Sequence, residues 1–136
     1  MKRKTIVKII AGCVLFYIGL VALFESLLGY FQPAGGNVVA ITTFDGEGNE
    51  FRRMVSLLQS EGQLYIAVNH WPRAWYRRLA DNPVMRMERE GIDGEYTAVE
   101  VFDAEYDQVQ ADNPTGFTFR FLTGFPPRYF VRLDPN

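Results

Sequence analysis

A chain of 136 residues has room for one domain and little more. Beyond Tyr30 it carries ten arginines, no lysine and fifteen acidic residues, and the resulting net charge of −5 excludes the basic surface of a nucleic-acid-binding domain. The one cysteine, Cys13, lies in an apolar stretch, and the one histidine is His70, which excludes a disulfide framework, an ordinary zinc site and Cys–His catalysis.

The N-terminal segment is typical of a transmembrane helix. Residues 6–28 hold about 20 apolar positions, the length that a helix needs to cross a bilayer. Four basic residues precede this stretch, and no Lys or Arg follows it before Arg52. This asymmetry predicts a single-pass anchor with a cytoplasmic N-terminus and a domain on the outer, periplasmic or extracellular, side of the membrane. Since the apolar part is long and no Ala-x-Ala-like site closes it, we expect the anchor to be uncleaved.

The rest of the chain is predicted to form strands. The stretch QPAGGN, residues 32–37, is a breaker-rich linker between the anchor, residues 1–31, and one domain, residues 38–136. Short runs rich in β-branched and aromatic residues then alternate with turn signals. The predicted extended segments are 38–44, 50–58, 64–68, 84–88, 95–102, 117–122 and 129–133.

One clear helix is predicted between the third and fourth strands. Pro72 lies near its start, Trp75 and Leu79 fall on one face at i and i+4, and Asn82-Pro83 ends it. The polar stretch 103–114 is the place for a second short helix. Connections of two to five residues require antiparallel neighbours. The predicted fold class is therefore mainly β, a small antiparallel barrel with one or two short helices behind a transmembrane helix, because closure removes the edge strands.

Residues 67–83, AVNHWPRAWYRRLADNP, concentrate the aromatic and basic side chains. Arginine forks suit phosphate or carboxylate, and flat rings suit a planar heterocycle. The segment therefore predicts a site for a cofactor that carries both a ring and phosphates. The alternative interpretation is structural: Trp75 and Leu79 form the core face of the helix, Arg77 and Arg78 are solvated, and His70 orients the turn.

Three stretches together resemble the split-barrel deazaflavin-dependent nitroreductase family, relatives of the flavin-binding split-barrel oxidoreductases. They are the hairpin FRRMVSLLQSEGQLYIAV, the segment AVNHWPRAWYRRLADNPVMRME and the closing FPPRYFVRL. The resemblance covers about residues 41–133, and its most specific part is the helix with Trp75, Tyr76, Leu79, Asn82 and Pro83.

The resemblance implies a split β-barrel with a deazaflavin or FMN in a groove and hydride transfer to a nitro compound, quinone or similar acceptor. It also implies a homodimer, since split barrels of related flavin families often dimerise across the cofactor groove. It identifies no catalytic residue and no metal site. The cofactor-binding residues that it implies are Arg52, Arg53, Asn69, His70, Trp71, Arg73, Trp75 and Tyr76.

One departure from the family keeps other functions open. The family's loop before the second strand is glycine-rich and basic, whereas here it is FDGEGNE, whose acidic residues repel phosphates. Three hypotheses follow. The chain is a membrane-anchored deazaflavin- or flavin-dependent reductase, or a non-catalytic split barrel that binds a ligand or a membrane-protein partner, or a structural envelope protein in which residues 67–83 are core.

Overall fold

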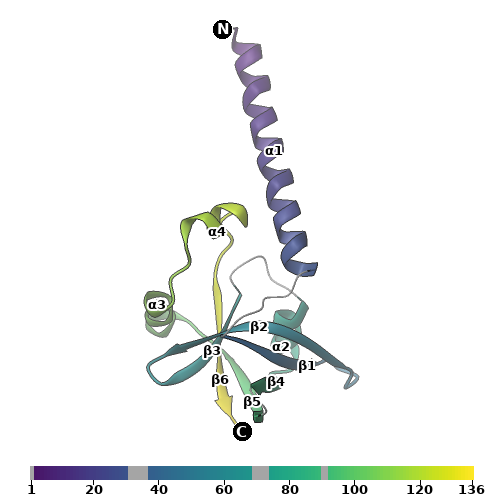
Figure 1. Ribbon diagram of the computed structural model, residues 1–136, viewed down its shortest axis with the longest axis vertical. Helices are drawn as coiled ribbons and strands as arrows, with labels where there is room; N and C mark the ends of the chain where they lie inside the picture. The colour runs from purple at the N-terminus through teal and green to yellow at the C-terminus, as the bar shows by residue number, and fades with distance from the viewer. Residues whose placement is uncertain (1, 31–36, 69–73, 90–91) are drawn as a thin grey trace.

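The computed structural model describes residues 2–30, 37–68, 74–89 and 92–136. A long N-terminal helix stands away from a small barrel, two short helices pack against that barrel, and a third short helix lies beside the long one (Figure 1). The helices are α1 (Arg3–Tyr30), α2 (Ala74–Asp81), α3 (Asp103–Asp112) and α4 (Phe117–Leu122). The strands are β1 (Val38–Phe44), β2 (Glu50–Ser60), β3 (Gln63–Val68), β4 (Val84–Arg89), β5 (Ile92–Glu100) and β6 (Tyr129–Pro135).

The strands close into a barrel in the order β1-β2-β3-β6-β5-β4, with every neighbouring pair antiparallel. Closure depends on β6, which pairs with β3 on one side and with β5 on the other. The β2–β3 connection is a two-residue hairpin turn at Glu61 and Gly62, both with positive φ, as the twist of such hairpins requires. The predicted small antiparallel barrel is confirmed.

Apolar side chains from the barrel strands and from α2 fill the interior. Trp75 and Leu79 on α2 are 4% and 5% exposed and join this core, which confirms the predicted apolar face of the helix. A second cluster lies outside the barrel wall, where α3 covers β3 and β6 through Val109. It includes Tyr65 and Phe130, so β3 and β6 are buried on both faces at this point.

The prediction of an extended segment at 117–122 is wrong, because these residues form α4. The alternation of Phe117, Phe119 and Phe121 has the period of a strand, but the barrel is closed and offers this segment no edge. Thr123 ends the helix with its amide and hydroxyl, which both donate to the Phe119 carbonyl. Among the described residues, three helices therefore follow α1, where one or two were predicted.

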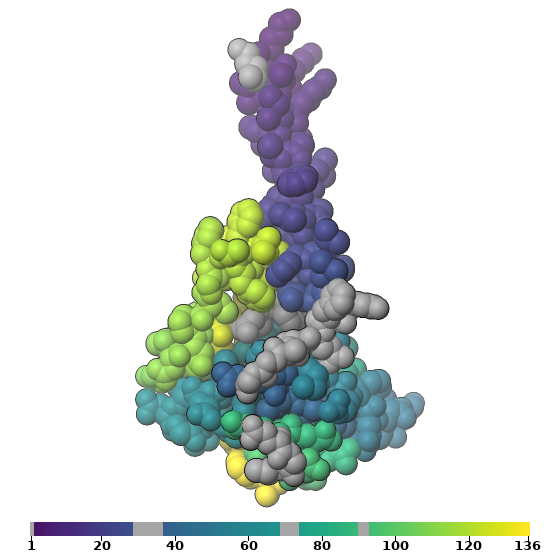
Figure 2. Space-filling model, in the orientation of Figure 1, coloured from purple at the N-terminus to yellow at the C-terminus, as the bar shows by residue number. Residues whose placement is uncertain are grey.

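Helix α1 is long and apolar enough to cross a membrane over Arg3–Leu28, where the mean hydropathy is 2.5. Its apolar side chains are exposed along most of its length. At its C-terminal end the Arg53 guanidinium donates to the Leu28 carbonyl at 3.4 Å. In space-filling view the helix is a column that meets the domain at its base and along the side of α4 (Figure 2).

Candidate functional site

An apolar cleft in the described part of the chain lies beside α2. Tyr76 follows the buried Trp75 and therefore points to the side of the helix, where its ring stacks on Tyr129 with centroids 5.4 Å apart and planes 24° apart. The cleft has a volume of about 370 Å³, within the ordinary range of ligand pockets. Its walls are Tyr76, Leu79, Ala80, Pro83, Ala98, Glu100 and Val131.

The polar edge of this cleft is formed by two side chains, Tyr76 and Glu100, joined by one hydrogen bond. The Tyr76 hydroxyl donates to Oε1 of Glu100 at 2.9 Å. Burial, followed by the bond to Glu100, raises the pKa of Tyr76 well above its usual range, so the phenol stays protonated at neutral pH. The cleft therefore offers two aliphatic walls and an aromatic edge to a flat ring, and its one carboxylate disfavours an anionic group.

Arg52 and Arg53 do not line the Tyr76 cleft. Nε and Nη2 of Arg52 both donate to Oε2 of Glu88 at 3.3 Å, on a surface where the two side chains are 61% and 46% exposed. Arg53, on the other face of β2, reaches the end of α1. Arg78, for which one interpretation of the sequence predicted a solvated face, instead donates from Nε to the Thr43 hydroxyl at 2.9 Å. Its guanidinium lies 3.9 Å from the Phe51 ring centroid, and both contacts tie α2 to the barrel.

Four of the predicted site residues, Asn69, His70, Trp71 and Arg73, lie outside the described residues. Trp75 is in the barrel core. Tyr76 is thus the one predicted cofactor residue that lines a cleft among those the structure describes. The remaining assignments stay predictions.

In the loop before β2, backbone amides are arranged as in an anion-binding site, and a carboxylate of the loop itself binds them. Oδ1 of Asp45 accepts the backbone N–H groups of Glu47 and Asn49, each at 2.9 Å. The Asn49 side chain donates to the other oxygen at 2.9 Å, and these bonds, led by the Asn49 side chain, lower the pKa of Asp45. An ionised carboxylate therefore occupies the amides that a phosphate would need.

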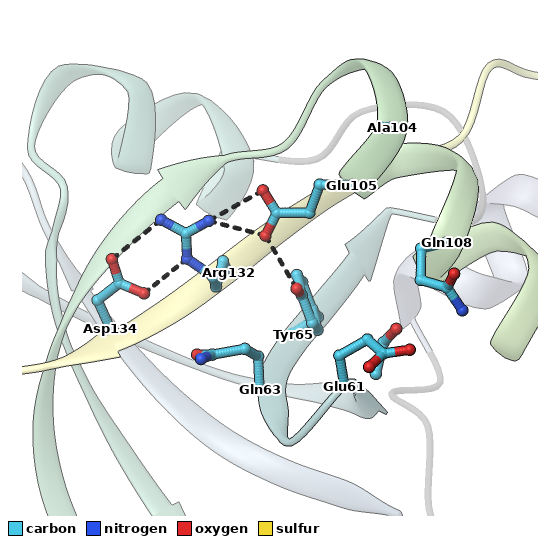
Figure 3. A pocket seen from close by; sticks show the side chains of 9 residues that line it. Glu61, Gln63, Tyr65, Ala104, Glu105, Gln108, Arg132 and Asp134 are labelled. Carbon is cyan, nitrogen blue, oxygen red and sulfur yellow. Dashed lines mark hydrogen bonds and ion pairs between the residues drawn. The ribbon is translucent and has the colours of Figure 1, made fainter.

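A second cleft, of about 620 Å³, lies between α3 and the paired strands β3 and β6 (Figure 3). At its centre Arg132 donates to both oxygens of Glu105 at 2.7 and 2.9 Å and to both oxygens of Asp134 at 2.7 and 3.2 Å. The Tyr65 hydroxyl donates to Glu105 at 2.9 Å. Burial, then the bond to Glu105, raises the pKa of Tyr65 to about 12.

This four-residue network, which we call the Arg132 clamp, is saturated. Both edges of the guanidinium are occupied by carboxylates, and Arg132 in turn lowers the pKa of Glu105. An anionic ligand therefore finds no open cation here, and the geometry fits a role in holding α3 against the barrel. The sequence analysis missed the clamp. The spacing of Arg132 and Asp134, which places both on one face of a strand, is the signal that could have indicated it.

Within residues 2–30, 37–68, 74–89 and 92–136, no group of three His, Cys, Asp or Glu side chains is arranged to hold a metal ion. The two clefts described above thus differ: the one beside α2 is apolar with an aromatic edge, and the one beside α3 is polar and closed by its own charges.

Comparison with known proteins supports the fold. No protein-family model matches the chain, and no curated protein matches it in sequence. Among solved structures it is similar to HutZ, the heme storage protein from Vibrio cholerae, with 19% identity, a TM-score of 0.55 and coverage of 74% of this chain and 82% of that one.

Two further structures are similar at lower identity. One is an F420-H2-dependent reductase, FDR-A, with 15% identity, a TM-score of 0.53 and coverage of 75% of this chain and 98% of that one. The other, described as a domain-swapped dimer, has 12% identity, a TM-score of 0.58 and coverage of 91% and 99%. At these identities the likeness is one of fold, and it confirms the resemblance to the flavin and deazaflavin split barrels at that level.

Proposed function

We propose that this chain is a membrane-anchored reductase that binds the ring of a deazaflavin or flavin in the Tyr76 cleft. The observation that carries the proposal is the cleft itself: aliphatic walls from Leu79, Ala98 and Val131 beside the stacked pair Tyr76 and Tyr129. An F420-H2-dependent reductase shares the fold, which supports the same chemical class. When bound, such a ring supplies a hydride to an organic acceptor.

The residues present fit the ring better than the tail. The cleft has the size and the apolar lining for a planar heterocycle. The loop at Asp45 does not fit a phosphate, since its amides already bind a carboxylate, and Arg52 is paired with Glu88. The proposal assigns the tail to the predicted residues Asn69, His70 and Arg73, together with the neighbouring Trp71.

The anchor belongs to the same proposal. As a membrane anchor, helix α1 would hold the domain at a membrane surface, where a lipid-soluble quinone is concentrated as acceptor, and the charge asymmetry of the sequence supports the outer side for the domain. The division into an anchor (1–31), a linker (32–37) and a barrel domain (38–136) is part of the proposal. So is a homodimer, which the domain-swapped dimer among the similar structures supports.

Tryptophan fluorescence of the detergent-solubilised full chain tests the ring site. It is titrated with an oxidised deazaflavin, with flavin mononucleotide and with lumiflavin, which is the flavin ring without a phosphate tail. Ala80 is exposed on α2 and lines the cleft, so Ala80→Phe fills the cleft without removing core contacts. Ala111→Phe, an exposed helical alanine on α3, is the matched control.

We expect micromolar quenching that Ala80→Phe weakens at least tenfold and Ala111→Phe leaves unchanged. Lumiflavin separates the ring from the tail, because its binding requires the cleft alone. Absence of quenching by all three compounds at high micromolar concentration would contradict cofactor binding. Reduction of a quinone by the reduced, bound cofactor would then establish turnover.

A second candidate function is a split barrel without catalysis that binds a different ligand or a membrane-protein partner. It is favoured by the self-filled loop at Asp45 and by a heme storage protein among the similar structures. Heme added to the same Ala80→Phe and Ala111→Phe pair distinguishes this reading. Specific heme binding without flavin binding would favour it over the reductase.

A further inference from the structure

The segment that carries α4 differs in charge from the rest of the domain. Residues 113–133 contain three arginines, Arg120, Arg128 and Arg132, and no Asp or Glu, although the chain beyond Tyr30 has a net charge of −5. The guanidinium of Arg132 is already bound to Asp134 and Glu105 in the Arg132 clamp. Arg120, on α4, and Arg128, which follows it, line one cavity of about 410 Å³.

The same segment exposes a cluster of phenylalanine rings. Phe117, Phe121 and Phe125 are 72%, 40% and 45% exposed, and their ring centroids lie 5.8 to 6.3 Å from one another. We call these three rings the phenylalanine cluster. An apolar patch of contiguous aromatic rings on a small acidic domain is typical of a surface that meets a membrane or a partner.

A strained turn holds the cluster together. After Thr123 ends α4, Gly124 and Phe125 adopt φ values of 79° and 53°. The left-handed region is unfavourable for a residue that carries a side chain. The backbone N–H of Phe125 donates to the Arg120 carbonyl at 2.8 Å, which fixes this conformation and turns the Phe125 ring toward Phe117 and Phe121. The fold thus stores strain to keep an apolar ring on the surface.

Helix α4 lies along α1, and this contact sets its depth. The Tyr17 ring packs on Phe121 with centroids 5.0 Å apart, and its hydroxyl donates to the Phe121 carbonyl at 2.8 Å. The rings of Phe24 and Phe119 are also in contact, with centroids 6.0 Å apart. Tyr17 precedes Leu28 by eleven residues, which is about 16 Å along a helix. Figure 2 shows α4, in yellow-green, against the side of the purple helix above the barrel.

We infer that residues 117–125 form a wedge that inserts among the acyl chains of an anionic bilayer, in the leaflet on the domain's side. The inference rests on the membrane-anchoring part of the proposed function. If α1 crosses the bilayer, the medium around Tyr17 also surrounds Phe121, and that medium is hydrocarbon. Lipid is therefore the occupant that the α1–α4 contact favours over a second protein.

The two arginines beside the wedge line a cavity that would take the phosphate of an anionic lipid headgroup. Burial lowers the pKa of Arg128 to about 10, opposed by Tyr106 and reinforced by the nearby Arg120. Arg128 also donates to the Gln110 side chain at 2.9 Å and to the Asn113 carbonyl, which orients it toward the cavity it shares with Arg120. A lipid phosphate in that cavity would lie between two guanidinium groups and relieve their repulsion.

Nitroxide accessibility in reconstituted bilayers tests the wedge with the full chain. One label sits on the native Cys13, which is exposed on α1 and reports whether the helix is inserted. In a Cys13→Ala background, Phe117→Cys reports on the wedge. Gly46→Cys, at an open turn where an added side chain meets nothing within 4 Å, is the aqueous control. Each label is relaxed by oxygen, which partitions into lipid, and by a water-soluble nickel chelate.

We expect the labels at 13 and 117 to be accessible to oxygen and protected from nickel, and the label at 46 to show the reverse. A lipid-like label at 13 with a nickel-accessible label at 117 would overturn the wedge and leave the anchor standing. A water-accessible label at 13 would overturn the anchoring and the wedge with it. Protection of the label at 117 from both reagents would indicate a protein partner and overturn the wedge.

A second measurement tests the arginines. Phosphatidylglycerol is added to phosphatidylcholine bilayers that hold the Phe117→Cys chain. We expect the ratio of oxygen to nickel accessibility at 117 to rise at least twofold, and Arg120→Gln to abolish the rise while leaving the label at 13 unchanged. An equal ratio in both lipid mixtures would remove the anionic headgroup from the proposal.

Discussion

The two clefts of the barrel contain the same pair of side chains in different settings. In each, a tyrosine hydroxyl donates to a glutamate at 2.9 Å: Tyr65 to Glu105 under α3, and Tyr76 to Glu100 beside α2. At the first, Arg132 binds the same glutamate and extends the network to Asp134. At the second, the described residues add no arginine to Glu100, and aliphatic walls take its place.

The difference separates a structural use of the pair from a binding use. A glutamate that is held by an arginine has its hydrogen-bonding capacity filled and links elements of the fold. A glutamate at the rim of an apolar cleft leaves room for a ligand beside the tyrosine ring. Changes to the arginine, the glutamate and the tyrosines of the two clefts test this contrast.

Removing Arg132 should have the largest effect. Arg132→Ala leaves Glu105 and Asp134 without their shared cation. Because hydrogen bonds to charged groups stabilise the folded state, we expect the removal of this side chain to lower the free energy of unfolding by about 2 kcal/mol. Urea denaturation should show that loss in the free energy of unfolding. The control is Arg52→Ala, whose pair with Glu88 is exposed and is worth about 0.5 kcal/mol or less. Equal effects of the two variants would show that the clamp is an ordinary surface pair.

Acid should weaken the clamp in a defined direction. Arg132 lowers the folded-state pKa of Glu105, so the contribution of this carboxylate is present above its unfolded value, about 4.3, and is lost as the pH falls through the lower folded value. Glu105→Gln should therefore be less stable than the natural chain at pH 7, and the difference should be smaller at pH 3. Urea midpoints at the two pH values measure this, and a difference that persists undiminished in acid would contradict it.

The smallest expected effect is on the alkaline titration of the two tyrosines. Burial and a glutamate raise the pKa of Tyr65 to about 12 and that of Tyr76 further, so neither ionises where an ordinary phenol does. Tyr65→Phe and Tyr76→Phe should each leave the phenolate absorbance formed up to about pH 11 unchanged. A fall in that absorbance for Tyr76→Phe alone would mean that its cleft is open to water at the hydroxyl.

Local periodicity explains which parts of the fold could be predicted. The spacing of Trp75 and Leu79 on α2 and the short runs of strand-forming residues in β2, β3 and β4, which alternate between buried and exposed in β4, act over a few residues, and the structure bears them out. Phe117, Phe119 and Phe121 alternate in the same way, yet they form a helix. Their pattern is local, but a strand also needs a partner, and the closed barrel has no edge left for one.

The candidate site divides along the same line. Tyr76 could be named because it belongs to a compact aromatic segment, and it does line a cleft. The pairing of Arg52 could not be predicted, since its partner Glu88 lies on a strand 36 residues away. Nor could the Arg132 clamp, whose residues come from β3, α3 and β6.

The sequence by itself determined the apolar helix, the barrel class and the buried face of α2, because hydrophobic period and turn chemistry are properties of neighbouring residues. Only the tertiary structure decided which arginines are already neutralised, which tyrosine borders an open cleft, and that the phenylalanines of α4 lie beside α1. Those outcomes depend on which side chains meet across the closed barrel, and such long-range pairing leaves no periodic trace in the chain.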